Sequence, residues 1–158
     1  MGSGKSSAGK ELAEFLGCRF IDLDEYIVHK AGKSIPDIFA EDPLRFRALE
    51  AEAVRDVFIM SRIEGFNVVL ALGGGSLLNP ETRALVFSQS SCCYLKATME
   101  TLRKRLQGST DRPLLQHGDL DTLFEERRSA YELAPLTVTT DNRTPSEIAS
   151  EILSRLDG

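Results

Sequence analysis

Four short apolar segments, separated by helical stretches, constrain the fold of this chain more than any other feature. The segment at 67–71 reads as a buried strand, and the others have strand length and composition. Strands that alternate with helices predict an α/β fold in which a mostly parallel sheet carries helices on both faces. The four predicted strands are residues 19–22, 67–71, 91–96 and 136–139.

Helix start signals lie between these strands. Ser34 with Asp37, Asn79 before Pro80, and the run from Thr144 to Glu147 predict helix N-termini, the last as a capping box. A long amphipathic helix is predicted between the first two strands from the spacing of Leu49, Ala53, Val57 and Met60. The first helix is predicted to bury one face and to stop at Gly17; that face consists of Ala8, Leu12, Phe15 and Leu16.

Composition excludes several classes of protein. The 158 residues suit a single domain spanning 1–158, and no apolar run approaches the roughly 18 residues of a membrane span. The net charge of −5 argues against nucleic acid and anionic membranes as partners. Neither the three cysteines nor the two histidines have metal-ligand or disulfide spacing. The cysteine usage therefore favours a reducing compartment. We further expect a monomer in the cytoplasm, or in the plastid stroma if an upstream transit peptide was lost.

The amino-terminal run Gly2-Ser3-Gly4-Lys5-Ser6 opens the first predicted helix. Such a turn surrounds phosphate oxygens with backbone N–H groups, while Lys5 reaches the β- and γ-phosphates and Ser6 binds Mg²⁺. Two alternatives remain open at this point: a flexible terminus, and N-myristoylation at Gly2. A strand normally precedes such a turn, and this sequence supplies none before Met1.

Two aspartates follow the first predicted strand. The period of two along a strand predicts that Asp22 and Asp24 point to the same side, at the sheet edge where ligands bind. Asp22 is then a candidate magnesium ligand, and Asp24 is a candidate base for an attacking hydroxyl. The alternative is local turn hydrogen bonding at a strand end.

The triplet Gly73-Gly74-Gly75 follows the second predicted strand, where residues without a Cβ let a ligand approach the main chain. Arg47 and Glu50 share a helical face, so the acid can orient the guanidinium toward an anionic ligand, although a surface ion pair is the default interpretation. Arg112 lies in a polar segment, about 107–121, that we expect to be a mobile lid. Arg127 and Arg128 precede Tyr131, and either arginine can hold an anionic substrate.

Taken in order, these motifs resemble those of the shikimate kinase family. They are Gly4-Lys5-Ser6, Asp22-x-Asp24, Phe46-Arg47-x-x-Glu50, Gly73-Gly74-Gly75, Arg112-Pro113-Leu114-Leu115 and Arg127-x-x-x-Tyr131. The resemblance implies a three-layer P-loop kinase fold with five parallel strands, of which the first is missing here. It also implies ATP and Mg²⁺ as cofactors and phosphorylation of the 3-hydroxyl of shikimate, a step in aromatic amino-acid precursor synthesis.

The same resemblance implies a role for each matching residue. Lys5, Asp24 and Arg112 are the implied catalytic residues, and Ser6 and Asp22 hold the metal. A helical region, about 25–65, contributes to substrate binding. The implied nucleotide-binding residues are Gly2, Gly4, Lys5, Ser6, Ser7 and Arg112, and the implied shikimate-binding residues are Asp24, Arg47, Glu50, Gly73, Gly74, Gly75 and Arg127. After Arg127 the family's usual proline and leucine are Ser129 and Ala130, which keeps Arg128 as an alternative.

Two other functions are carried as alternatives. A related small-molecule kinase, such as a gluconate kinase, shares the phosphate loop and the lid, but the glycine triplet and Arg47 argue against it. The second alternative is a non-catalytic module that lost its nucleotide site together with the first strand.

Overall fold

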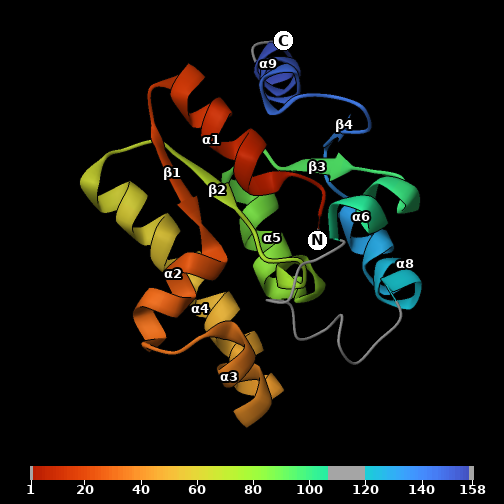
Figure 1. Cartoon of the computed structure of the whole chain (residues 1–158). Coiled ribbons are helices and arrows are strands. Elements are labelled where there is room, and N and C mark those ends of the chain that lie inside the picture. Colours follow the sequence, from red (N-terminus) through yellow and green to blue (C-terminus); the bar gives the residue numbers. More distant parts are fainter. Residues whose placement is uncertain (1, 107–119, 157–158) are drawn as a thin grey trace.

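The structure, a computed structural model, describes residues 2–106 and 120–156 of the chain. Helices and strands alternate along it as the sequence predicts, and Figure 1 shows their arrangement. In chain order the elements are α1 (Lys5–Leu16), β1 (Arg19–Asp22), α2 (Leu23–Ala31), α3 (Ile35–Glu41), α4 (Pro43–Glu64), β2 (Val68–Ala71), the 3₁₀ turn η1 (Ser76–Leu78), α5 (Pro80–Gln89), β3 (Cys93–Lys96), α6 (Met99–Leu106), α8 (Leu120–Tyr131), β4 (Leu136–Thr139) and α9 (Pro145–Leu156).

The predicted caps are confirmed atom by atom. The Asn79 side chain accepts from the N–H groups of Glu81 and Thr82 at the start of α5. At α9 the capping box is reciprocal, because the Thr144 hydroxyl accepts from the Glu147 N–H while the Glu147 carboxylate accepts from the Thr144 N–H. Strong side-chain signals of this kind act within one turn, which is why sequence alone locates them.

The strands form two parallel pairs. β1 pairs with β2, and β3 pairs with β4. Among the described residues no strand joins β2 to β3, so the sheet consists of two separate two-stranded halves.

Helices cover both faces of the two strand pairs. α1 and α9 pack against each other and, together with Leu95 and Val138, form one apolar cluster. On the other face, helices α2 to α5 and α8 form a second cluster, which includes Cys92. Cys93 packs against the first cluster, so the two neighbouring cysteines point to opposite faces as predicted. Within residues 2–106 and 120–156, no helix is both long and apolar enough to cross a bilayer.

The buried face of α1 differs from the predicted one. Ala8 and Leu12 are buried as expected, but Phe15 and Leu16 are exposed, at 45% and 44%. Gly9 is buried instead, because a Cβ there would come within 2.6 Å of the Phe20 ring of β1. The helix therefore approaches the sheet closely near its amino end, which is the end that carries the glycine-rich turn.

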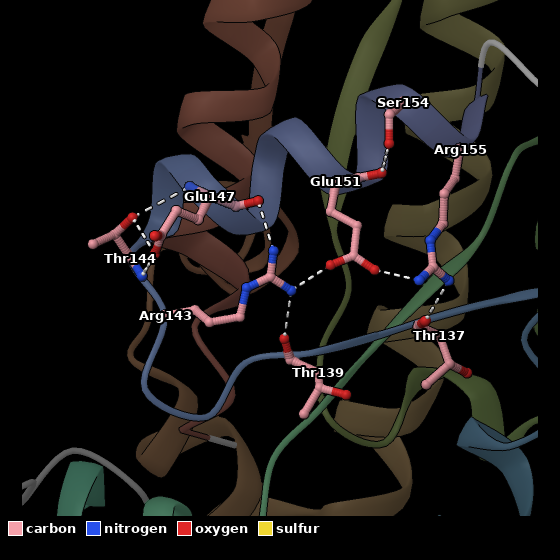
Figure 2. A network of polar contacts seen from close by, with 8 residues as sticks. All are labelled: Thr137, Thr139, Arg143, Thr144, Glu147, Glu151, Ser154 and Arg155. Carbon is pink, nitrogen blue, oxygen red and sulfur yellow. Dashed lines mark hydrogen bonds and ion pairs between the residues drawn. The ribbon is translucent and has the colours of Figure 1, made fainter.

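A polar network covers the outer edge of β4 (Figure 2). The Arg143 guanidinium donates to the Thr139 carbonyl, and the Arg155 guanidinium donates to the Thr137 carbonyl. Both arginines bind the carboxylate of Glu151 on α9. Because edge-strand carbonyls otherwise offer a pairing site to other chains, the network protects this edge.

Candidate active site

The glycine-rich turn adopts a backbone that favours glycine at two positions. Gly2 has a φ of +69° and Gly4 a φ of +90°, and Gly4 is the N-cap of α1. Among the described residues, only the Arg105 side chain, at 3.9 Å, would meet a Cβ at Gly4, so the positive φ is the observed reason for glycine there. The N–H groups that begin a 12-residue helix thus surround an open turn, which suits a phosphate group.

Ser6 and Asp22 form an oxygen pair beside this turn. The Ser6 hydroxyl donates to Asp22 Oδ2 at 2.6 Å, and Asp22 Oδ1 accepts from the Asp24 N–H at 3.0 Å. A hydroxyl and a carboxylate this close suit Mg²⁺, which prefers oxygen ligands and keeps waters and substrate phosphates as its remaining ligands. The residues present therefore fit the implied metal. The alternative interpretation of Asp22 was local turn hydrogen bonding. This bonding is present as well, because Asp22 accepts from the Asp24 N–H.

Asp24 does not lie on a strand, so the strand-period argument for this residue was wrong. β1 ends at Asp22, whose side chain caps α2, and Asp24 lies in the first turn of that helix. Because Asp22 caps α2, the helix begins at Leu23, whereas the strand-period argument extends the strand to Asp24. Asp24 nevertheless faces the second half of the site, because a Cβ at Gly73 would lie 3.2 Å from its Oδ1.

Each glycine of the triplet leaves room for a different charged side chain. A Cβ at Gly73 would lie 2.5 Å from Glu50 Oε1, one at Gly74 would lie 2.6 Å from Arg127 Nη1, and one at Gly75 would overlap the Arg47 guanidinium. None of the three has a positive φ. The triplet is packed against four charged residues, Asp24, Arg47, Glu50 and Arg127. Close approach of a ligand to its main chain stays a prediction.

Glu50 is a buried carboxylate that holds two partners. It is 3% exposed, and its Oε2 accepts from Arg47 while its Oε1 accepts from the Ser76 hydroxyl at 3.1 Å. The pair of Arg47 and Glu50 was predicted from spacing, but burial distinguishes it from an ordinary surface ion pair. Sequence reasoning missed Ser76, because a serine after a glycine turn carries no signal of its own.

The structure separates Arg127 from Arg128. Arg127 is 4% exposed, and within the described residues its Nε has no hydrogen-bond partner. Arg128 is half exposed and pairs with Glu125 and Glu132 on the surface of its own helix. A buried guanidinium with spare donor capacity suits an anionic ligand, so the structure favours Arg127 over Arg128 as the candidate.

Tyr131 supports Arg127 one helical turn away. Its hydroxyl donates to the Gly74 carbonyl, and its ring packs near that of Tyr94. Burial raises the pKa of Tyr131 above its usual value of 10.0, and the neighbouring Arg127 opposes that rise. The phenol therefore remains a hydrogen-bond donor at neutral pH.

Arg105 is a further site residue that sequence reasoning missed. Its guanidinium donates to the Gly2 carbonyl at 3.2 Å and to the hydroxyl and carbonyl of Thr140, which is fully buried. The contact ties α6 to the glycine-rich turn. Nothing in the run Arg103-Lys104-Arg105 distinguishes this arginine from its exposed neighbours.

Lys5, in the first turn of α1, borders a mostly apolar cavity between β2 and β3 together with Gly73, Gly74 and Tyr131. Arg47, Glu50 and Gly75 line a second cavity. Ser7 lies exposed in the same helical turn, and its role in nucleotide binding stays a prediction. Arg112 and most of the expected lid lie outside the described residues, while residues 120 and 121 begin α8.

Comparisons with known proteins identify the family of this chain. The family model described as "Shikimate kinase" matches residues 1–157. The chain is 40% identical to a shikimate kinase of Dictyoglomus turgidum, covering 99% of this chain and 92% of that protein. It is 42% identical to a shikimate kinase of Geobacter metallireducens, covering 100% of this chain and 88% of that protein.

Solved structures give the same result. The shikimate kinase of Acinetobacter baumannii in complex with shikimate superposes with a TM-score of 0.90 at 33% identity, covering 99% of this chain and 88% of that one. The enzyme of Aquifex aeolicus superposes with a TM-score of 0.84 at 36% identity, covering 100% and 92%. Sequence and fold thus lead to one conclusion: this chain belongs to the shikimate kinase family.

Proposed function

We propose that this chain is an ATP-dependent kinase that phosphorylates the 3-hydroxyl of shikimate. The observation that carries the proposal is the position of Asp24. It lies two residues after Asp22, which binds Ser6 of the phosphate loop, and its carboxylate faces Gly73 and the charged cluster around the glycine triplet. A base between a phosphate site and a site for a carboxylated alcohol is the arrangement that phosphoryl transfer requires.

On the nucleotide side, the chain contributes positive charge and oriented donors. Bound Mg–ATP supplies the phosphoryl group and a metal charge that neutralises the phosphates. The turn at Gly2–Gly4 and the amino end of α1 direct N–H groups at the phosphates, Lys5 adds a cation, and Ser6 with Asp22 would hold the metal. Arg105 fixes the turn through the Gly2 carbonyl.

On the acceptor side, two guanidinium groups hold the substrate carboxylate. Arg47 is oriented by Glu50, and Arg127 is buried against Gly74. With the carboxylate fixed, a ring hydroxyl lies at Asp24, which accepts its proton as the oxygen attacks phosphorus. Positioning and charge account for most of the rate enhancement, because phosphoryl transfer needs little covalent help from protein.

The same proposal covers the domain organisation, the lid, the oligomeric state and the location of the enzyme. Residues 1–158 act as one domain, with 25–65 as the substrate-binding region, since α4 supplies Arg47 and Glu50. Residues 107–121 act as a lid through Arg112. We also propose that the enzyme is a monomer of the cytoplasm; the three unpaired cysteine thiols support a reducing compartment.

Steady-state release of ADP tests the proposal. The chain is mixed with Mg–ATP and either shikimate or gluconate, and Lys5→Ala serves as the matched variant. We expect shikimate-dependent turnover that falls about 10²–10³-fold in Lys5→Ala, since one phosphate counter-charge is lost. Turnover with gluconate alone would favour the related kinase. Absence of turnover with either alcohol, despite Mg–ATP binding seen by calorimetry, would contradict the proposal.

A further inference from the structure

Ser76 is a buried polar residue whose position follows from the glycine triplet before it. It is the first residue of η1, and its N–H donates to the Gly73 carbonyl at 3.2 Å, which turns the chain back toward the triplet. Ser76 is 3% exposed, so its hydroxyl needs a partner inside the protein. The turn thus places a hydroxyl group in the interior beside the charged cluster.

The partner of this hydroxyl is a carboxylate from a distant part of the chain. The Ser76 hydroxyl donates to Glu50 Oε1 at 3.1 Å, across 26 positions of sequence. Both oxygens lie close to one point, because a Cβ at Gly73 would be 2.5 Å from Glu50 Oε1 and 3.0 Å from Ser76 Oγ. Glycine at position 73 therefore makes room for the hydrogen bond that joins α4 to η1.

The two oxygens of Glu50 have different partners. Oε1 accepts from Ser76, and Oε2 binds Arg47 through Nη1. The other terminal nitrogen of Arg47, Nη2, lies beside Gly75, since a Cβ there would be 2.9 Å from it. A carboxylate without other partners frequently binds a guanidinium with both of its oxygens. Ser76 thus favours a one-point contact, which leaves Nη2 of Arg47 for a ligand.

A cavity beside this pair gives the Glu50 carboxylate room to turn. Its volume is about 300 Å³, and Arg47, Glu50, Gly75 and Ser76 all line it. Close-packed surroundings would hold a carboxylate in place after one partner is removed, whereas a cavity does not. On this side, the hydrogen bond from Ser76 rather than packing therefore fixes the orientation of the carboxylate.

We propose that Ser76 is a positioning residue for the acceptor site. Its hydroxyl holds Glu50 Oε1, and Glu50 in turn presents the Arg47 guanidinium with Nη2 available to the substrate carboxylate. This role rests on the proposed function, since it concerns binding of the acceptor. Ser76 takes part in no chemical step, so its removal should affect acceptor binding and not phosphoryl transfer.

Steady-state kinetics of two serine variants test the role. Ser76→Ala removes the hydroxyl and adds no bulk. Ser61→Ala is the matched control, because it removes another partly buried hydroxyl, bound to the Phe66 carbonyl at the far end of α4. Ser76→Ala should raise the KM for shikimate about 5–10-fold, because a charge-assisted contact to the substrate is lost. The kcat and the KM for Mg–ATP should stay within about twofold.

Ser61→Ala should change none of these three constants. A lower unfolding midpoint of Ser76→Ala with an unchanged KM for shikimate would make Ser76 merely structural and would overturn the proposal. A double-mutant cycle then tests the route. In an Arg47→Ala background, Ser76→Ala should change the calorimetric affinity for shikimate less than about twofold. The full 5–10-fold effect in that background would overturn action through Arg47.

Crystal structures of the chain and of Ser76→Ala without ligands give a readout that needs no turnover. In the variant we expect the Glu50 carboxylate to turn until both of its oxygens contact the Arg47 guanidinium. An unchanged one-point contact would overturn the proposal. If the parent chain shows no turnover that depends on shikimate, the proposed function fails, and the two structures still decide whether Ser76 orients Glu50 and Arg47.

Discussion

Arg127 lies against Gly74 so closely that a Cβ at position 74 would come within 2.6 Å of its Nη1. The glycine thus sets the position of a buried guanidinium rather than the shape of a turn. Gly73 and Gly75 stand in the same relation to Glu50 and Arg47. One short segment after β2 therefore determines where the charges for an anionic substrate are placed.

Gly74→Ala should weaken shikimate binding about tenfold and leave Mg–ATP binding unchanged. The atom that the new methyl group meets is the end of a long side chain, so Arg127 moves and the fold is preserved, with a stability change under about 1 kcal/mol. Calorimetric titration with each ligand and a denaturant titration check this. Unchanged shikimate affinity would mean that Arg127 is not positioned through Gly74.

Arg127 and Arg128 are neighbours in the chain, so alanine variants of the two can be compared directly. Arg127→Ala should raise the KM for shikimate about 10–100-fold, because a charge-assisted contact to the carboxylate is lost. Arg128→Ala should change neither KM nor kcat, since its partners are Glu125 and Glu132 on the helix surface. Equal effects of the two substitutions would refute the assignment of Arg127.

Asp24→Asn should lower kcat about 10²–10⁴-fold while Mg–ATP still binds, because the amide cannot accept the hydroxyl proton. Asp22→Asn is the contrasting variant, and it should raise the Mg²⁺ concentration needed for half-maximal rate, because Asp22 and its partner Ser6 would hold the metal. Stopped-flow binding of nucleotide and steady-state rates at several Mg²⁺ concentrations separate the two roles. Full turnover of Asp24→Asn would exclude Asp24 as the base.

The network at the outer edge of β4 should affect stability alone. Glu151→Ala releases Arg143 and Arg155 from their shared carboxylate and should lower the free energy of unfolding by about 1 kcal/mol, discounted for the partial exposure of Arg155. Glu100→Ala, which breaks an exposed pair with Lys104, is the control and should leave stability unchanged. A change in turnover after Glu151→Ala would contradict a purely structural role.

The cysteines predict an alkaline loss of stability. Burial raises the pKa of Cys92 to about 11 and that of Cys93 to about 12, from an ordinary 9.0. A thiol whose pKa is raised by folding stabilises the native state below the unfolded pKa, and this contribution is lost as pH rises toward the folded pKa. The free energy of unfolding should therefore fall between about pH 9 and pH 12. The variant with both Cys92→Ala and Cys93→Ala should show a shallower fall, and an identical slope would contradict the assignment.

Sequence alone predicts those parts of this molecule that depend on local chemistry. Caps at Asn79 and Thr144 act within one turn, and β1 and β4 end at the predicted residues. Prediction from sequence alone fails for features that depend on long-range packing. Asp24 was placed on a strand because nothing in the sequence shows that Asp22 caps a helix, and Ser76 and Arg105 acquire roles only through residues far away in the chain.

The proposed function requires that the transferred phosphate and the acceptor hydroxyl meet at Asp24. The most direct test is to incubate the full chain with Mg–ATP and shikimate and to identify the product by phosphorus NMR and mass spectrometry. We predict a phosphate monoester at the 3-hydroxyl, formed in equal amount with ADP. ATP hydrolysis at the same rate with and without shikimate, and no ester, would contradict the claim.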